Sequence, residues 1–310
     1  MTARKDQINF MQHPELERLR QLLQDQAYIT DDSIVLSVFL ARQLQKPLLI
    51  EGPAGVGKTE IAKVMARAMD TDLIRMQCYE GLDATHALYE WNYQHQLLYL
   101  KMLEKQEATP EDMERSLFGD RFLLKRPLLQ AITHHKTPLL LIDEVDRADE
   151  EFESFLLEVL SDWQITIPEI GTIKATHIPQ VILTSNRVRE LSEALRRRCL
   201  YLWIDYPDYD KELAIVRRKV PQIDARLSEQ ICLFMQEVRK QRLEKVPGIA
   251  ETLDWAMALA NLHIDHLDKE LVSSTMGIVL KDWQDIRQTQ MSLSELFDRV
   301  GAISKLDTNG

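Results

Sequence analysis

The eight residues Gly52-Pro53-Ala54-Gly55-Val56-Gly57-Lys58-Thr59 fit the phosphate-binding loop pattern G-x-x-x-x-G-K-[ST] without a gap. The short apolar run 47–51 before them predicts a buried strand. After them, residues 60–69 place apolar side chains at the spacing of one helical face. Strand, loop and helix in this order form the context in which the pattern binds a nucleotide, so a chance match is improbable.

The residue types in this loop have a chemical reason. Glycine permits the tight backbone angles that let several N–H groups point inward at phosphate oxygens. Lys58 is expected to reach the β- and γ-phosphates of ATP, and Thr59 to offer its hydroxyl to Mg²⁺. The N-terminus of the following helix adds partial positive charge. Residues 52–59 are therefore the predicted nucleotide-binding loop.

A second polar group follows the apolar run 138–142. Asp143 and Glu144 stand where this predicted strand ends, and ligands gather at the carboxyl ends of strands in an open α/β sheet. Asp143 is expected to hold Mg²⁺ through its water shell, and Glu144 to polarise the water that attacks the γ-phosphate. Asn186 ends the predicted strand 181–186 and is a candidate for orienting that water; its alternative role is in a turn or cap.

Three consecutive cations, Arg196 to Arg198, precede the predicted strand 200–204. A run of charges is usually a solvated face. An arginine that reaches the γ-phosphate bound by a neighbouring subunit has a different role. It stabilises the transition state of hydrolysis and raises the rate by about 10³ to 10⁵. The pattern leaves both interpretations open.

Two further stretches give less specific signals. Tyr28 and Ile29 are candidates for walling an adenine ring, and ordinary core packing explains them equally well. Residues 79–106 are rich in aromatic side chains and predict an insertion with its own helix. Aromatic residues can stack on nucleic-acid bases, but a cationic groove must accompany them. Hardly any cation does so here, so packing or protein contact is favoured.

The composition restricts the classes of function. A chain of 310 residues predicts about two domains, and a net charge of −11 argues against a surface built for nucleic-acid backbones. The three cysteines form no C-x-x-C pair, so neither a zinc site nor a disulfide framework is expected. His134 and His135 are adjacent, so we expect them to point differently and to make a poor metal pair. Without a signal-peptide core or a membrane-length apolar run, we expect a soluble cytoplasmic protein with no membrane partner.

The pattern of elements changes after residue 205. Before it, strands and helices alternate, which predicts an α/β domain over residues 1–205. This domain includes the insert at about 79–106 and a β-hairpin at about 164–176. Beyond it, residues 206–310 predict an all-α domain with a C-terminal tail. Its helices are expected at about 209–219, 227–244, 250–262, 268–280 and 292–300.

With these motifs in place, the chain resembles the AAA+ ATPases of the MoxR group. The resemblance is carried by GPAGVGKT at 52–59, LLLIDEVDRA at 139–148, LTSN at 183–186 and EALRRRC at 193–199. It implies an AAA+ P-loop NTPase core, a five-stranded parallel sheet flanked by helices, with a C-terminal helical lid. It also implies ATP hydrolysis and a homo-oligomeric ring, commonly a hexamer. The arginine finger would lie in the last of these segments, where Arg198 aligns best with the family.

At the level of the subgroup, the chain is similar to the CoxD branch, which is associated with maturation of the molybdenum- and copper-containing carbon monoxide dehydrogenase. This similarity is carried by QCYEGLD at 77–83, YEWNYQ at 89–94 and PGIAETLDWA at 247–256. It implies a remodelling chaperone with a metalloenzyme client of the molybdenum hydroxylase type. It also implies a partner protein that bears a von Willebrand factor type A domain.

One position departs from the family. Many relatives carry a second-sensor arginine at the start of a lid helix, and Ile249 stands at that place here; Arg242 and Lys245 are candidate substitutes. The departure keeps open a nucleotide-sensing assembly scaffold in which hydrolysis is slow. A nucleic-acid motor is a further alternative, against which the acidic net charge weighs.

Overall fold

The computed structural model describes residues 13–83, 87–103, 117–119 and 121–307. The chain divides into two compact units. Unit 1 contains Asp32–Glu51 and Thr59–Trp203, together with the N-terminal stretch up to Leu19. Unit 2 contains Arg20–Asp31, Gly52–Lys58 and the C-terminal part from Ile204. The predicted domain boundary at 205/206 stays a prediction.

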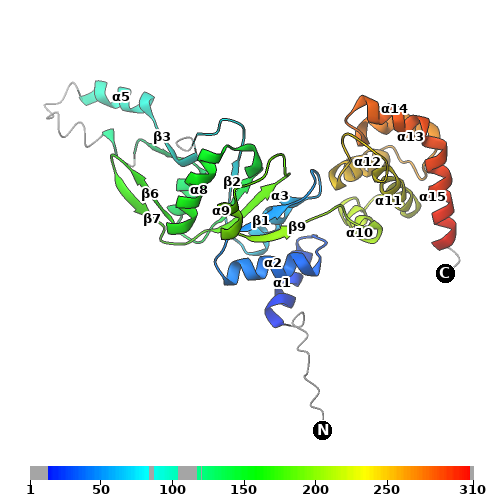
Figure 1. Cartoon of the computed structure of the whole chain (residues 1–310), viewed down its shortest axis with the longest axis horizontal. Helices are drawn as coiled ribbons and strands as arrows, with labels where there is room; N and C mark the ends of the chain where they lie inside the picture. Colours follow the sequence, from blue (N-terminus) through cyan, green and yellow to red (C-terminus); the bar gives the residue numbers. More distant parts are fainter. Residues whose placement is uncertain (1–12, 84–86, 104–116, 120, 308–310) are drawn as a thin grey trace, which may run out of the picture. The chain divides into compact units, whose positions relative to one another are not determined.

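Unit 1 is built on a parallel sheet of five strands (Figure 1), in the order β2-β5-β8-β1-β9. The strands are β1 (Leu48–Glu51), β2 (Leu73–Gln77), β5 (Leu139–Asp143), β8 (Gln180–Ser185) and β9 (Leu200–Trp203). Every residue of β1 and β5 is buried. A strand covered on both faces needs apolar side chains in succession, not in alternation. The predicted five-stranded parallel sheet is confirmed.

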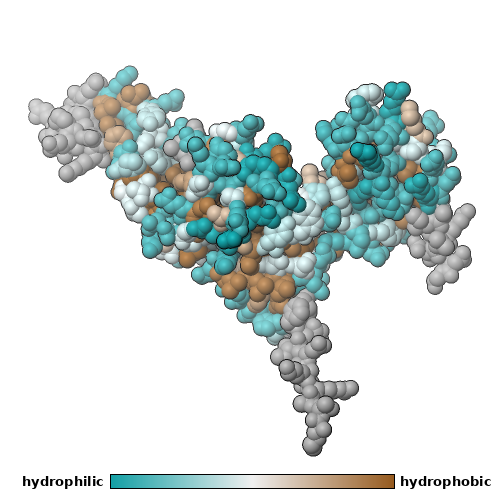
Figure 2. Space-filling view, in the orientation of Figure 1, coloured by the Kyte–Doolittle hydropathy of each residue, from teal (hydrophilic) through white to brown (hydrophobic). Residues whose placement is uncertain are grey.

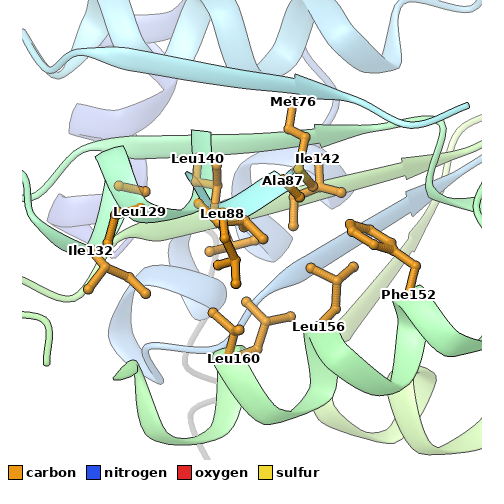
Figure 3. Packing of buried hydrophobic residues seen from close by; sticks show 14 of the residues in the cluster. Met76, Ala87, Leu88, Leu129, Ile132, Leu140, Ile142, Phe152, Leu156 and Leu160 are labelled. Atoms are coloured by element: carbon orange, nitrogen blue, oxygen red, sulfur yellow. The ribbon is translucent and has the colours of Figure 1, made fainter. Parts of the chain in front are cut away.

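Helices flank this sheet (Figure 1). They are α2 (Asp32–Gln43), α3 (Lys58–Ala68), α7 (Pro127–Ile132), α8 (Glu150–Asp162) and α9 (Glu193–Arg198), and the first helix of the chain is α1 (Pro14–Asp25). Figure 3 shows Leu140 and Ile142 of β5 packed with Leu129 of α7 and with Phe152 and Leu156 of α8. Burying each such side chain contributes about 1.5 to 3 kcal/mol. This core fixes the strand ends that carry the polar residues described below.

Two small antiparallel pairs complete unit 1. Strands β6 (Gln164–Ile167) and β7 (Gly171–Lys174) form a hairpin, where the sequence predicts one. Strand β3 (Tyr89–Trp91) pairs with β4 (Leu123–Lys125), and α5 (Tyr93–Leu103) follows β3. The predicted insert therefore contains a helix; residues 84–86 and 104–106 of it lie outside the described residues.

Unit 2 is helical in its C-terminal part. Its helices are α10 (Tyr209–Lys219), α11 (Ala225–Arg239), α12 (Ile249–Asn261), α13 (Lys269–Val279), α14 (Trp283–Met291) and α15 (Leu293–Asp307). Their core contains Trp255, whose ring centroid lies 5.5 Å from that of Phe234. The sequence pattern missed α14 because the residues it buries, Asp285 and Thr289, are polar.

Helix α11 ends at Arg239, five residues earlier than the predicted end at 244. The side chain of Asp285 explains the difference. Its two oxygens accept the backbone N–H groups of Glu244 and Lys245 at 2.9 and 3.0 Å. Those N–H groups are satisfied outside a helix, so the chain can leave α11 here. Among all the described residues, none of the helices combines the length and apolar character needed to cross a membrane.

Candidate functional site

The glycines of the phosphate loop each have a structural reason. Gly55 and Gly57 have positive φ angles of 77° and 94°, which side chains with a Cβ rarely adopt. At Gly52 the constraint is space, because an added Cβ would lie 2.0 Å from the carbonyl oxygen of Ile204. The loop therefore has the tight backbone that the sequence pattern predicts.

Lys58 is buried within this loop. Its ammonium group donates to the carbonyl oxygens of Gly52 at 2.7 Å and of Pro53 at 2.6 Å. Only 6% of the residue is exposed. The lysine is thus folded back over the loop from which the sequence predicts it to reach phosphates.

The start of α12 contacts the loop through backbone atoms. The carbonyl oxygen of Gly55 accepts the N–H of Ile249 at 3.0 Å and that of Ala250 at 3.4 Å. A Cβ added to Gly248 would lie 2.7 Å from three backbone atoms of Gly55. Because no real Cβ sits so close to backbone, glycine is required at this approach. Ile249 therefore meets the loop with its amide.

Arg239, which the sequence analysis missed, holds this segment in place. Its guanidinium donates to the carbonyl oxygens of Pro247 at 2.8 Å and Gly248 at 3.3 Å. It also forms an ion pair with Glu212 at 2.6 Å and donates to the hydroxyl of Thr252 at 3.0 Å. Only its tertiary contacts reveal this role, because nothing in the local sequence of α11 distinguishes Arg239 from a surface arginine.

In unit 1, the structure brings Thr59 and Asp143 together. The hydroxyl of Thr59 donates to Asp143 Oδ1 at 2.9 Å, and that of Thr184 donates to the same oxygen at 2.5 Å. The other oxygen, Oδ2, accepts from Arg75 through Nη2 at 2.6 Å and Nε at 3.1 Å. Asp143 is 3% exposed. A buried carboxylate of this kind is stable only when paired and hydrogen-bonded.

Glu144 lies directly after β5 with a positive φ of 54°. Its backbone N–H donates to the hydroxyl oxygen of Thr184 at 2.9 Å. Its carboxylate accepts from Gln77 Nε2 at 3.0 Å and from Asn186 Nδ2 at 3.4 Å. Arg147 approaches the same carboxylate at 3.7 Å. Two amide groups, from the ends of β2 and β8, thus hold the predicted water-polarising carboxylate between them.

Asp146 positions Asn186. Its Oδ2 accepts the backbone N–H groups of Asn186 at 3.1 Å and Val188 at 2.8 Å, although about 40 residues separate them in the chain. The residue is 2% exposed. Sequence reasoning did not assign it a role, although it belongs to the acidic run that drew attention to Asp143 and Glu144.

The negative charges of these acids act on the buried thiol of Cys78. Burial chiefly, and then the charges of Asp143, Asp146 and Glu144, raise the pKa of Cys78 from 9.0 to about 12. A thiol with so high a pKa stays protonated and unreactive at neutral pH. Burial, reinforced by the acids near the end of β5, therefore leaves Cys78 as a packing residue.

The three arginines of α9 have different partners. Arg196 lies over the ring of Tyr201, with its guanidinium carbon 5.8 Å from the centroid. Arg197 pairs with Glu193 at 2.5 Å, and both side chains are 77% exposed. Arg198 donates from Nε to the hydroxyl oxygen of Ser161 at 3.0 Å. Its role towards a neighbouring subunit stays a prediction.

Tyr28 and Ile29 lie between α1 and α2 and are half-buried. The backbone N–H of Tyr28 donates to the carbonyl oxygen of Leu23 at 3.2 Å, which ends the turn after α1. Both residues belong to unit 2. Their contact with an adenine stays a prediction.

His134 and His135 do not point apart as expected. Their rings stack with centroids 4.5 Å apart, and with Asp72 they form a group of metal-ligating side chains within the described residues. The ammonium of Lys136 lies 3.3 Å from the Asp72 oxygen that His134 approaches at 3.4 Å. Because a lysine already balances the carboxylate, we assign no metal to this group.

A phosphate loop after β1 and paired acids at the end of β5, in a five-stranded parallel sheet, define an α/β P-loop NTPase. Residues 47–199 match the family model of the AAA domain (dynein-related subfamily). This part of the chain is therefore an AAA domain.

Three known proteins are similar to this chain. It is 26% identical over 244 residues to the gas vesicle ATPase GvpN of Haloferax mediterranei, covering 76% of this chain and 67% of that protein. It is 26% identical over 248 residues to an uncharacterized protein of Staphylococcus haemolyticus, covering 78% and 86%. Among solved structures, the RuvB Holliday junction branch migration motor of Thermotoga maritima matches with a TM-score of 0.45 and 17% identity, covering 84% of this chain and 68% of that one.

Proposed function

We propose that this protein is a Mg²⁺-dependent ATPase that works as an AAA+ remodelling chaperone in a homo-oligomeric ring, commonly a hexamer. The observation that carries the proposal is the cluster of Thr59, Asp143, Glu144 and Asn186. They come from three separate parts of the sequence, the start of α3, the end of β5 and the end of β8, and they lie at the carboxyl ends of these two strands.

The residues present fit Mg²⁺. The hydroxyl oxygen of Thr59 and a carboxylate oxygen of Asp143 lie 2.9 Å apart and are possible metal ligands. Mg²⁺ prefers oxygen ligands and keeps several of its waters. Thr59 would hold the ion directly and Asp143 through its water shell. When bound, the ion neutralises charge on the β- and γ-phosphates.

The chain itself supplies the remaining groups. Lys58 and the backbone N–H groups of residues 52–59 would bind the phosphates. Glu144, held by Gln77 and Asn186, would accept a hydrogen bond from the attacking water and act as the general base that takes its proton. Asn186 would orient that water, which is consistent with the backbone anchor that Asp146 provides.

Arg198 is our proposed arginine finger towards a neighbouring subunit. Among the described residues, its side chain forms one hydrogen bond, to Ser161, so turning it towards another subunit costs little. Arg197, one residue earlier in the same helix and paired with Glu193, provides a matched control. The ring itself is supported by the resemblance to the MoxR group.

The proposed client is a metalloenzyme of the molybdenum hydroxylase type, and the proposed partner carries a von Willebrand factor type A domain. Both rest on the resemblance to the CoxD branch. In the insert, Trp91 is 6% exposed and packs edge to face on Phe118 at 5.3 Å, whereas Tyr79 and Tyr93 are exposed. A side chain packed like that of Trp91 offers no platform for a base.

The test is ATPase rate against protein concentration, measured for wild type and for an equimolar mixture of Arg198→Ala and Glu144→Gln. A shared site predicts that activity per protomer rises with concentration and that the two inactive variants partly restore each other. Arg197→Ala mixed with Glu144→Gln should behave like diluted wild type. A flat rate, with no restoration on mixing, would refute the finger in trans.

One observation favours a second function, a nucleotide-sensing assembly scaffold. The start of α12 donates the amides of Ile249 and Ala250 to the phosphate loop, and the resemblance to the MoxR group implies that Ile249 stands where many relatives carry an arginine. The scaffold predicts that Glu144→Gln supports partner assembly as well as wild type. Loss of assembly in that variant would favour the hydrolysing chaperone.

A further inference from the structure

Arg75 is a part of the site that the sequence motifs did not reveal. It lies on β2, in register with Leu141 of the neighbouring strand β5, two residues before the Gln77–Asp143 pair. From there its guanidinium reaches Asp143 Oδ2 with two N–H groups, at 2.6 and 3.1 Å. The same Nη2 donates to Gln77 Oε1 at 2.7 Å.

The two oxygens of Asp143 have different kinds of partner. Oδ1 accepts from two neutral hydroxyl groups, those of Thr59 and Thr184. Oδ2 accepts from the positively charged Arg75. Hydroxyl groups satisfy hydrogen bonds but leave the negative charge uncompensated, and a buried charge is costly unless it is paired. The arginine therefore supplies the charge that stabilises a carboxylate with 4% of its side chain exposed.

A magnesium ion whose water shell binds Asp143 would offer the same carboxylate a second positive charge. A guanidinium and a hydrated cation cannot both occupy the hydrogen-bonding positions of one oxygen at full strength. Arg75 is able to withdraw, because its side chain is 48% exposed, whereas that of Asp143 is fixed by its neighbours.

We propose that Arg75 is a built-in counter-ion of Asp143 that competes with Mg²⁺ and sets the Mg²⁺ concentration at which nucleotide binds. The inference rests on the proposed function, since it takes Asp143 as a magnesium residue. Gln77 links the competition to hydrolysis: its oxygen accepts from Arg75 and its nitrogen donates to Glu144. Withdrawal of Arg75 would thus also free the oxygen of Gln77, one of the two amides that hold Glu144.

The test is a titration with MgCl₂ at fixed concentration of a fluorescent ATP analogue, with nucleotide binding as the readout. Arg75→Gln keeps a hydrogen-bond donor but removes the charge. We expect its half-saturating Mg²⁺ concentration to fall on the order of tenfold, within the usual range of coupling between sites. Arg75→Lys keeps the charge, so its value should stay near that of wild type.

A control separates this effect from the loss of any arginine. Arg217 forms an ion pair of the same length with Glu229, 2.6 Å, and is 45% exposed. Arg217→Ala should leave the Mg²⁺ requirement unchanged. A second readout is the melting temperature: Arg75→Gln should melt below wild type without Mg²⁺ and gain more than wild type when Mg²⁺ and nucleotide are added, because the ion then compensates Asp143.

The outcomes distinguish the two proposals. If wild type binds no nucleotide at any Mg²⁺ concentration, the proposed ATPase function fails. If wild type binds and Arg75→Gln requires as much Mg²⁺ as wild type, or more, Arg75 is no competitor and this inference is overturned while the ATPase stands. Should Arg75→Gln not fold, a Mg²⁺ requirement for Arg75→Lys that departs tenfold from wild type would contradict the charge argument.

Discussion

The backbone N–H of Ile249, the first residue of α12, donates to the carbonyl oxygen of Gly55 in the phosphate loop at 3.0 Å. Gly248 makes this approach possible, since it lacks the Cβ that would collide with the loop. The loop and the helix start are therefore joined by hydrogen bonds between backbone atoms. A change in the loop would act directly on the backbone of α12.

Replacing Gly248 by alanine should disturb this contact. The added Cβ would lie 2.7 Å from the backbone of Gly55, and such overpacking costs about 1 to 3 kcal/mol. We expect a lower free energy of unfolding and weaker ATP binding, measured by urea denaturation and nucleotide titration. Gly277→Ala, in a helix with nothing within 4 Å of the new Cβ, should be neutral or stabilising by up to about 1 kcal/mol. Equal behaviour of the two variants would contradict the contact.

Replacing Arg239 by alanine should destabilise unit 2 strongly. It would leave Glu212, which is 0% exposed, without its cation, and breaking a buried pair from one side costs about 3 to 5 kcal/mol. Arg217→Ala removes an exposed pair and should cost less than about 1 kcal/mol. Urea denaturation of both variants measures the difference. A loss of stability no larger for Arg239→Ala than for Arg217→Ala would show that Glu212 is not held by this arginine.

Asp146 and Asn186 should act as one unit in hydrolysis. Asp146→Ala removes the acceptor for the backbone N–H groups of Asn186 and Val188, so the amide of Asn186 would no longer be fixed beside Glu144. We expect the kcat of each single variant to fall by about 10 to 100 fold and the double variant with Asn186→Ala to be little worse than either. Additive losses in kcat would mean that Asp146 acts independently of Asn186.

The three cysteines should resist alkylation in the folded protein. Burial raises the pKa of Cys78 and of Cys199 to about 12, and that of Cys232 also lies far above 9.0. At pH 8 the thiolate fraction of a group with a pKa near 12 is about 10⁻⁴, so iodoacetamide should label the unfolded protein much faster than the folded one. Rapid labelling of one cysteine under native conditions would show that its side chain is accessible.

The same thiols make stability depend on alkaline pH. Their folded pKa values lie above the unfolded value of 9.0, so above about pH 9 the unfolded chain releases protons that the folded chain retains. The free energy of unfolding should therefore be unaffected below pH 9 and should decline from pH 9 towards 12. Urea denaturation across this window measures the decline, and a Cys199→Ala variant should show a shallower one.

Patterns of neighbouring residues predicted much of the fold. The sheet could be predicted from the apolar runs that form β1, β5 and β8. Strands that are buried on both faces contain continuous runs of hydrophobic residues. Helix α14 was not predicted because its buried side chains are polar. The early end of α11 was not predicted either. Asp285, whose carboxylate replaces the helical hydrogen bonds, lies about 40 residues further along the chain.

By itself, the sequence determined the phosphate loop and the acids at the end of β5. Glycine spacing and strand ends are local properties, since backbone sterics and hydrophobic burial act over a few residues. The tertiary structure alone decided which charges meet. Arg75 joins Asp143 across 68 residues and Arg239 joins Glu212 across 27, and such partners are set by the packing of whole strands and helices, which leaves no mark in the residues on either side.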